Sequence, residues 1–297
     1  MNETIKSDYY KRIEIAIKFI EDNLKNKLSL DLVAEQACFS KYHFIRVFTA
    51  MTGETVGSYA RRRRVTRSSK ELITSDKSIL AIAIDYQFES QEAYTRSFKR
   101  IYHTTPGMYR KHGLNQIAYG RSRLTVSRLL HLQNNITMKP KIVEIPRKTL
   151  VGMNTITSLA DNRIPQLWEN FMARAHEIQE NKKTGYYEVH PYDGNFKMED
   201  YTETMEFEKW ATVEVDTVRD VPENMKAHLL TGGKYAMFVH KGSMSNVQVS
   251  FDYIYGTWLP NSGYEFDLRD DFERYDPQKY FGPGHPDSEM EIYVPIK

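Results

Sequence analysis

The chain has a single cysteine, Cys38, among its 297 residues. An internal disulfide and a thiol-rich metal site are therefore both excluded. The sequence also lacks any run of about 18 apolar residues, so no helix is expected to cross a membrane. Because the N-terminal segment has no apolar signal core, we expect a cytoplasmic protein rather than a secreted one.

Two common catalytic motifs are missing as well. The sequence contains no G-x-S-x-G nucleophile motif and no H-E-x-x-H metal motif. Among the histidines of the second half, four are scattered and lack metal-ligand spacing, namely His190, His228, His240 and His285. We therefore expect no metal, no cofactor and no enzymatic activity. The competing function is an enzyme, such as a hydrolase, for which Glu273, Tyr275, His240 and His285 are available.

Charge is distributed unevenly, although the whole chain carries only +2. Residues 1–135 hold 23 Lys and Arg against 13 Asp and Glu, a net charge of +10. Residues 136–297 hold 18 and 26, a net charge of −8. An anionic partner is expected for the first part and a different one for the second. The alternative is that this charge only aids solubility.

A helix-turn-helix pattern occurs twice in the first 112 residues, from Leu28 to Phe48 and from Ser78 to Phe98. The matched positions are Phe39 and Phe88, Ser40 and Ser90, Arg46 and Arg96, and Phe48 and Phe98. Such a pair can place two recognition helices in successive major grooves of one DNA face. We expect an all-α domain over residues 1–112, with a spacer helix between the copies. Because its four arginines, 61–64, wrap around that helix, one or two should meet DNA phosphates and the others solvent or acidic neighbours.

Helical periodicity divides each recognition helix into an inner and an outer side. The outer residues are the predicted DNA-binding residues: Lys41, Tyr42, Ile45 and Arg46 in the first helix, and Gln91, Glu92, Thr95, Arg96 and Lys99 in the second. Arginine can bind guanine or phosphate, isoleucine a thymine methyl, glutamine adenine, and glutamate the amino group of cytosine. For each residue, the alternative is a solvated helix face.

The stretch from about Tyr10 to Lys111 resembles the DNA-binding domain of the AraC/XylS family of transcription regulators. The resemblance rests on Leu30–Phe48, on the segment around Tyr59–Arg64, and on F-x-S-Q-x-x-Y-x-R-x-F-K followed by P-x-x-Y-R. It implies that the outer residues bind promoter DNA and that RNA polymerase is a partner. Two motifs in one chain remove the need for a dimer without forbidding one, so we expect a monomer on DNA. Cys38 and Gln87 replace the glycines usual at the two turns, where a left-handed residue costs about 1 kcal/mol. Cys38 is expected to be a small buried filler.

From Met138 onward the pattern changes to strands and amphipathic helices. Strands are predicted at Ile142–Asn154, Tyr186–Pro191, Phe207–Thr217, Lys234–Lys241, Tyr264–Leu268, Phe272–Tyr275 and Met290–Ile296. Helices are predicted around Leu167–Ile178 and Val247–Trp258. Two β-α-β-β repeats related by a pseudo-two-fold axis predict an α+β domain over residues 138–297, built on an antiparallel sheet. Residues 113–137 would form the linker, with a short helix as one interpretation.

Glu273 lies among aromatic residues in D-D-F-E-R-Y-D-P. An acidic group in such surroundings suits a cationic, apolar ligand through charge pairing and cation–π contact. Strand alternation places Trp210 on the face opposite Ala211 and Val213, where it could line a cleft. The alternatives are an exposed glutamate and tryptophans that only pack in the core.

Residues from about Met138 to Lys297 resemble the GyrI-like effector-binding domain. The matching pieces are I-V-E-I-P-R-K-T-L-V-G, G-G-K-Y-A-M-F-V-H-K-G, Y-G-T-W-L-P, F-E-R-Y-D-P and M-E-I-Y-V-P-I-K. The family often binds lipophilic cations beside a glutamate, to which Glu273 corresponds. The resemblance implies a small lipophilic, cationic effector with Trp168, Trp210 and Phe238 as candidate walls.

An AraC-type domain followed by a GyrI-like domain is similar to the Rob-type architecture. It implies an effector-modulated transcription regulator, with activation as the expected mode. Two alternatives remain for the second domain: a hydrolase, or a ligand-free protein-interaction module.

Overall fold

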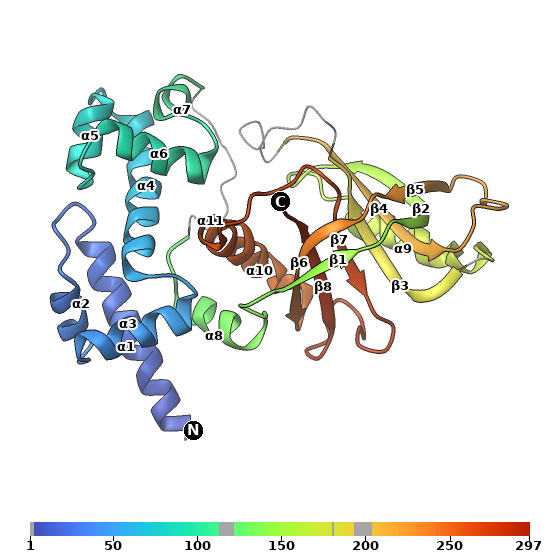
Figure 1. Cartoon of the computed structure of the whole chain (residues 1–297), viewed down its shortest axis with the longest axis horizontal. Helices are drawn as coiled ribbons and strands as arrows, with labels where there is room; N and C mark the ends of the chain where they lie inside the picture. Colours follow the sequence, from blue (N-terminus) through green and yellow to red (C-terminus); the bar gives the residue numbers. More distant parts are fainter. Residues whose placement is uncertain (1–2, 113–121, 180, 193–203) are drawn as a thin grey trace. The chain divides into compact units, whose positions relative to one another are not determined.

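The computed structural model describes residues 3–112, 122–179, 181–192 and 204–297 (Figure 1). They divide into two compact units. Unit 1 consists of Met1–Asn134 and Val249–Gly263, and unit 2 of Asn135–Gln248 and Tyr264–Lys297. Of the helices in the described ranges, none combines the length and apolar character that a membrane span requires.

Unit 1 is helical. Its helices up to Asn134 are α1 (Glu3–Asp22), α2 (Leu30–Gln36), α3 (Lys41–Thr52), α4 (Val56–Thr74), α5 (Ile79–Asp85), α6 (Gln91–Tyr102), α7 (Pro106–His112) and α8 (Val126–Asn134). The pairs α2–α3 and α5–α6 form the two predicted motifs. Between them α4 has 19 residues, about 28 Å of helix, and so is the expected spacer.

Both motif turns contain a non-glycine residue in the left-handed region. Cys38 has φ 53° and Gln87 has φ 62°, as the missing glycines predicted. The expectation that Cys38 is a buried filler is wrong, because its side chain is exposed. Its carbonyl accepts a hydrogen bond from Arg12 Nη1 at 3.0 Å. Packing space therefore does not explain a cysteine at this turn.

Unit 2 is built on an antiparallel sheet. Its strands are β1 (Lys141–Ile145), β2 (Lys148–Thr157), β3 (Asn181–His190), β4 (Phe207–Val215), β5 (Lys226–Leu230), β6 (Gly233–Lys241), β7 (Asp271–Tyr275) and β8 (Glu289–Pro295). They lie in the order β1-β6-β8-β7-β3-β4-β2-β5. The order is symmetric about the β7–β3 pair: β2, β3 and β4 correspond to β6, β7 and β8. The predicted pseudo-two-fold repeats are therefore present.

Three strand predictions differ from the structure. The predicted strand 142–154 is broken at Pro146 and Arg147 into β1 and β2, because proline cannot donate a ladder hydrogen bond. Segment 264–268 forms only an isolated bridge, between Phe266 and Ile296. Strand β5 was not predicted, although it pairs with β2 along its whole length.

The two faces of the sheet bury different side chains. Helix α9 (Ile164–Arg174) packs on one face through Leu167 and Phe171, against Val151, Ala211 and Val213. The opposite face buries a second cluster, made of Leu150, Tyr187, Val189, Trp210, Leu230, Tyr235, Phe272 and Tyr293. The strands are thus covered by apolar contacts on both sides.

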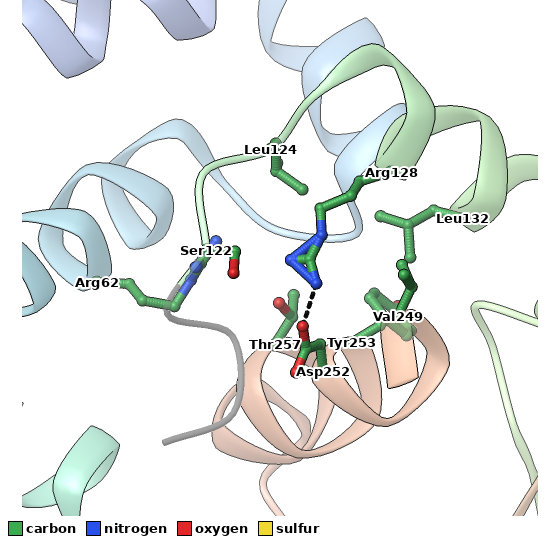
Figure 2. Close-up of a pocket in the computed structure, with 9 residues that line it drawn as sticks. All are labelled: Arg62, Ser122, Leu124, Arg128, Leu132, Val249, Asp252, Tyr253 and Thr257. Atoms are coloured by element: carbon green, nitrogen blue, oxygen red, sulfur yellow. Dashed lines mark hydrogen bonds and ion pairs between the residues drawn. The ribbon is translucent and has the colours of Figure 1, made fainter. Parts of the chain in front are cut away.

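Unit 1 also includes a segment from between β6 and β7. Helix α10 (Val247–Tyr253), a π-helical turn (Ile254–Trp258) and α11 (Leu259–Ser262) supply residues 249–263. Arg128 of α8 forms an ion pair with Asp252 of α10 beside a small pocket (Figure 2). His131 and Ser250 form a buried hydrogen bond of 2.8 Å between the same two helices. Of the expected linker, residues 113–121 lie outside the described residues, and 126–134 form α8 within unit 1.

Candidate DNA-binding and effector sites

Helix α3 exposes most of its predicted DNA-binding residues. Lys41, Tyr42 and Arg46 are exposed, whereas Ile45 is half-buried. Tyr42 leaves 83% of its surface in solvent, which is unusual for a large aromatic side chain. Lys41 is paired with Asp31 of α2 at 3.0 Å, so a phosphate would have to compete with that carboxylate.

Helix α6 presents a similar outer side. Gln91, Glu92, Arg96 and Lys99 are exposed, and Thr95 is half-buried. Glu92 follows the N-cap residue Ser90, whose side-chain hydrogen bond holds the pKa of Glu92 below its ordinary value. A carboxylate thus stays ionised at the start of this helix, where it is available to a base amino group and repels phosphate.

Buried hydroxyl contacts fix the recognition helix α6 to the spacer α4. Tyr94 and Tyr102 point inward from α6 and are almost fully buried. Their hydroxyls hydrogen bond to Ser68 at 2.9 Å and to Ser69 at 2.8 Å. Phe98 stacks on Tyr102, with ring centroids 4.6 Å apart. The orientation of the exposed side of α6 is therefore set by specific contacts with α4.

Three of the four consecutive arginines have structural roles. Arg62 is buried and pairs with Glu54 at 2.5 Å, and Arg63 pairs with Glu21 at 2.5 Å. Arg64 donates to two backbone carbonyls, those of Leu24 and Asn26, in the turn that follows α1. Arg61 is exposed. The prediction that acidic neighbours take some of these arginines is confirmed.

The pKa of Glu21 reflects this pairing. Burial by itself would raise the pKa, but the hydrogen bond and charge of Arg63 lower it below the ordinary value, with help from the Tyr59 hydroxyl. Glu21 is therefore ionised at neutral pH, and it ties α1 to α4.

In unit 2, one row of the sheet contains Glu273. Strand register pairs Phe238 with Ile292, Ile292 with Glu273, Glu273 with Glu188, and Glu188 with Ala211. Directly paired residues of antiparallel strands project from the same face. Phe238 and Glu273 therefore share one face, the face on which α9 packs, as the Ala211 contact shows.

A charged cluster lies on this face. The ammonium of Lys209 is 3.1 Å from Glu188 Oε1 and 3.4 Å from Glu273 Oε2. All three residues are at least 92% buried, with exposed fractions of 8%, 7% and 5% respectively. We call Glu188, Lys209 and Glu273 the acidic triad, since two carboxylates share one ammonium.

Aromatic residues border the acidic triad. Trp168 of α9 donates its indole N–H to Glu188 Oε2 at 2.7 Å, and the Tyr275 hydroxyl lies 3.4 Å from the same oxygen. The rings of Trp168 and Tyr275 meet edge to face at 5.2 Å, and Tyr280 lies 4.8 Å from Tyr275. Carboxyl groups beside aromatic rings are a combination suited to an organic cation.

Burial shifts the pKa values of this cluster. It raises the pKa of Glu273 to about 8, against the opposing attraction of Lys209. Burial alone would lower the pKa of Lys209, but Glu273 and Glu188 together raise it above its ordinary value. The lysine is therefore charged at neutral pH, whereas the proton on Glu273 is held near the physiological range.

The structure does not bring Trp210 to this group. Trp210 pairs with Val189, which pairs with Phe272, so Trp210 projects from the other face. There it packs in the apolar cluster, with its ring 5.1 Å from His228. Of the candidate walls, Trp168 and Phe238 share the face of Glu273 and Trp210 does not.

Glu188 and Lys209 were not identified from the sequence. Strand alternation carried a usable signal, since Lys209 continues the row of Ala211, Val213 and Val215, which is an apolar strand face. A charge on such a row requires a partner. The partner was not visible from the sequence, because it lies on another strand. Within the described ranges, no group of three His, Cys, Asp or Glu residues could hold a metal ion.

Comparison with known proteins agrees with this description. Residues 138–297 match the family of GyrI-like small molecule binding domains, and residues 33–112 match a helix-turn-helix domain family. The chain belongs to the AraC-type regulators with a GyrI-like domain. It is a DNA-binding transcription regulator with a small-molecule-binding domain.

Three relatives illustrate the extent of the similarity. The Right origin-binding protein of Escherichia coli (strain K12) is 30% identical over 94% of this chain and 96% of its own length. The transcriptional regulator BrlR of Pseudomonas aeruginosa is 33% identical over 63% of this chain and 67% of its own. The HTH-type transcriptional activator AarP of Providencia stuartii is 41% identical over 31% of this chain and 68% of its own.

Proposed function

We propose that this regulator reads two successive major grooves of promoter DNA with the outer sides of α3 and α6. The proposed contacts are Lys41, Tyr42, Ile45 and Arg46 from α3, and Gln91, Glu92, Thr95, Arg96 and Lys99 from α6. The supporting observation is the matched exposure of Arg46 and Arg96. Among the described residues, neither arginine has a carboxylate within ion-pair distance, in contrast to the buried pairs of Arg62 and Arg63.

The test uses the full-length protein and a DNA site that it selects from a random pool. Arg46→Ala and Arg96→Ala should each weaken binding to that site by about 1–3 kcal/mol and relax the base preference at separate positions. Lys18→Ala, on the exposed side of α1, is the matched control for loss of one positive charge. If both arginine variants keep the affinity and selectivity of the parent, the proposed reading mode is wrong.

We also propose that the face of Glu273 binds a small lipophilic monovalent cation. When both of its carboxyl groups are ionised, the acidic triad carries one more negative than positive group, and Trp168 and Tyr275 supply rings beside it. A buried excess negative charge is unfavourable alone and is compensated by a cation. Phe238, in the same row, extends this face with an apolar side chain.

Tetraphenylphosphonium is a suitable probe, because its charge is shielded by phenyl groups. We expect Glu273→Gln to weaken its binding at least about tenfold by calorimetry, which corresponds to 1.4 kcal/mol. Glu208→Gln is the control, since this half-buried carboxyl lies on β4 and bonds to Asn154 away from the triad. Equal affinities for the parent and Glu273→Gln would refute a role for this carboxylate.

The last part of the proposal concerns where the protein acts, its partners and its mode of action. We propose a cytoplasmic monomer that activates transcription together with RNA polymerase, supported by the two motifs in one chain and by the relative named as an activator. We further propose that the second domain binds its ligand without converting it, since the relatives are regulators. An activator should raise transcription from the selected site in a purified RNA polymerase system, and tetraphenylphosphonium should be recovered unchanged after incubation.

A further inference from the structure

We propose that Lys209 is an internal cation that competes with the effector for Glu188 and Glu273, and thereby sets the cation affinity of the site. This inference rests on the proposed effector site around Glu273. It adds a residue that determines affinity and selectivity for charge, located on β4 rather than on the strand of the glutamate.

The position of the ammonium carries the argument. Lys209 lies on the face of β4 that also bears Ala211, and it reaches across β3 to β7. Its Nζ atom is 3.1 Å from one carboxylate and 3.4 Å from the other, which is ion-pair distance for both. A ligand cation that pairs with Glu273 must therefore approach within a few ångströms of a like charge.

Burial makes this competition strong. Like charges repel more at low effective dielectric, and all members of the acidic triad are buried. Trp168 and Tyr275 stabilise Glu188 through neutral donors, so Glu188 keeps polar partners when Lys209 is removed. If Lys209 competes with the ligand, its removal should strengthen cation binding. If the lysine only holds the two carboxylates together, its removal should abolish binding.

Two variants separate these roles. Lys209→Met keeps the length of the side chain and removes its charge, but it leaves two carboxylates without an ammonium. The double variant Glu188→Gln with Lys209→Met removes both members of the 3.1 Å pair and leaves Glu273 as the only ionisable group of the triad. If the single variant does not fold, the cation affinity of the double variant still tests the role of Lys209.

The measurement is the dissociation constant of full-length protein for tetraphenylphosphonium and for the neutral triphenylphosphine oxide. At pH values high enough for the cation affinity of each protein to level off, we expect the Met variants to bind the cation at least about tenfold more tightly than their parents and the neutral compound with unchanged affinity. For the double variant, the parent is Glu188→Gln. Lys182→Met, which removes an exposed partner of Glu214 and Asp216, is the control and should change neither constant.

The outcomes distinguish this inference from the proposed function. Cation binding that depends on Glu273 but does not tighten in the folded Met variants overturns the role of Lys209 alone. Equal tightening for the cation and the neutral compound also overturns it, because a change in cavity shape would then be the cause. Absence of any dependence on Glu273 overturns the proposed effector site itself.

Discussion

Glu188 and Glu273 are direct register partners on the neighbouring strands β3 and β7, and both are buried. Two carboxylates so close together resist simultaneous ionisation unless a cation lies beside them. These strands are also the central pair of the pseudo-two-fold sheet, where the two repeats meet. The sheet thus places two buried carboxyl groups, and the ammonium that they share, at the junction of the repeats.

The first prediction concerns the pH dependence of effector binding. Burial raises the pKa of Glu273 to about 8, so the free carboxyl ionises only as the pH approaches that value. A bound cation favours the ionised form, and we expect tetraphenylphosphonium affinity to rise about tenfold from pH 6.5 to 8.5 and then level off. Calorimetry at several pH values measures this, and Glu273→Gln should give a flat profile.

The same carboxyl affects stability with a defined sign. Its folded pKa is raised above the unfolded value, so the folded state binds more protons between about pH 4.5 and 8. The contribution of Glu273 to the unfolding free energy should therefore fall as the pH rises through this window. A parent protein and a Glu273→Gln variant whose stabilities change in parallel across it would contradict this assignment.

The second prediction concerns the anchoring of α6. Ser68→Ala leaves the buried Tyr94 hydroxyl without this partner and should lower the unfolding free energy of the full chain by about 1–3 kcal/mol. Combining it with Tyr94→Phe removes the unsatisfied hydroxyl, so the double variant should recover part of the loss. Urea unfolding of all four proteins measures the coupling, which would be zero if the two hydroxyls did not interact.

The third prediction compares a buried ion pair with an exposed one. Glu54→Gln leaves the charge of Arg62 buried without its carboxylate and should lower the unfolding free energy by about 3–5 kcal/mol. Asp22→Asn breaks the exposed Lys18 pair on α1 and should cost less than about 1 kcal/mol. Similar losses for the two variants, in the same urea titration, would show that burial is not the deciding factor.

The fourth prediction concerns the attachment of α10 within unit 1. Asp252→Asn weakens the charge-assisted contact with Arg128, which should cost about 1–3 kcal/mol and increase hydrogen exchange in α8 (Figure 2). Asp287→Asn, whose exposed partner Lys241 is 3.8 Å away, is the matched control. Unchanged exchange in α8 would mean that this ion pair does not hold the helix.

The sequence predicted the helical part well, because helix faces are set by local periodicity. Ile13, Ile17, Ile20 and Leu24 occur at a spacing of 4, 3 and 4, and all are at most 3% exposed. The inner sides of the two recognition helices hold Phe44, Phe48, Tyr94 and Phe98, all of which are buried. Each of these assignments needs only the neighbouring turns of one helix.

Contacts between distant segments were harder to predict. Alternation along β4 correctly separated Trp210 from Ala211, but only the pairing of β4, β3 and β7 shows which of these faces holds Glu273. The partnership of Lys209 with Glu188 and Glu273 depends on the same register. Strand β5 was missed because K-A-H-L-L shows little alternation, and its place beside β2 is what makes it a strand.

Residues 249–263 determine how the chain can be divided into fragments or joined into chimeras. They belong to unit 1, yet they are encoded between β6 and β7 of unit 2. A fragment that stops at residue 134 therefore lacks Asp252 and Ser250, the partners of Arg128 and His131. Chimeras with relatives should exchange both pieces of unit 1 together, because a single crossover point would combine α8 of one protein with α10 of the other.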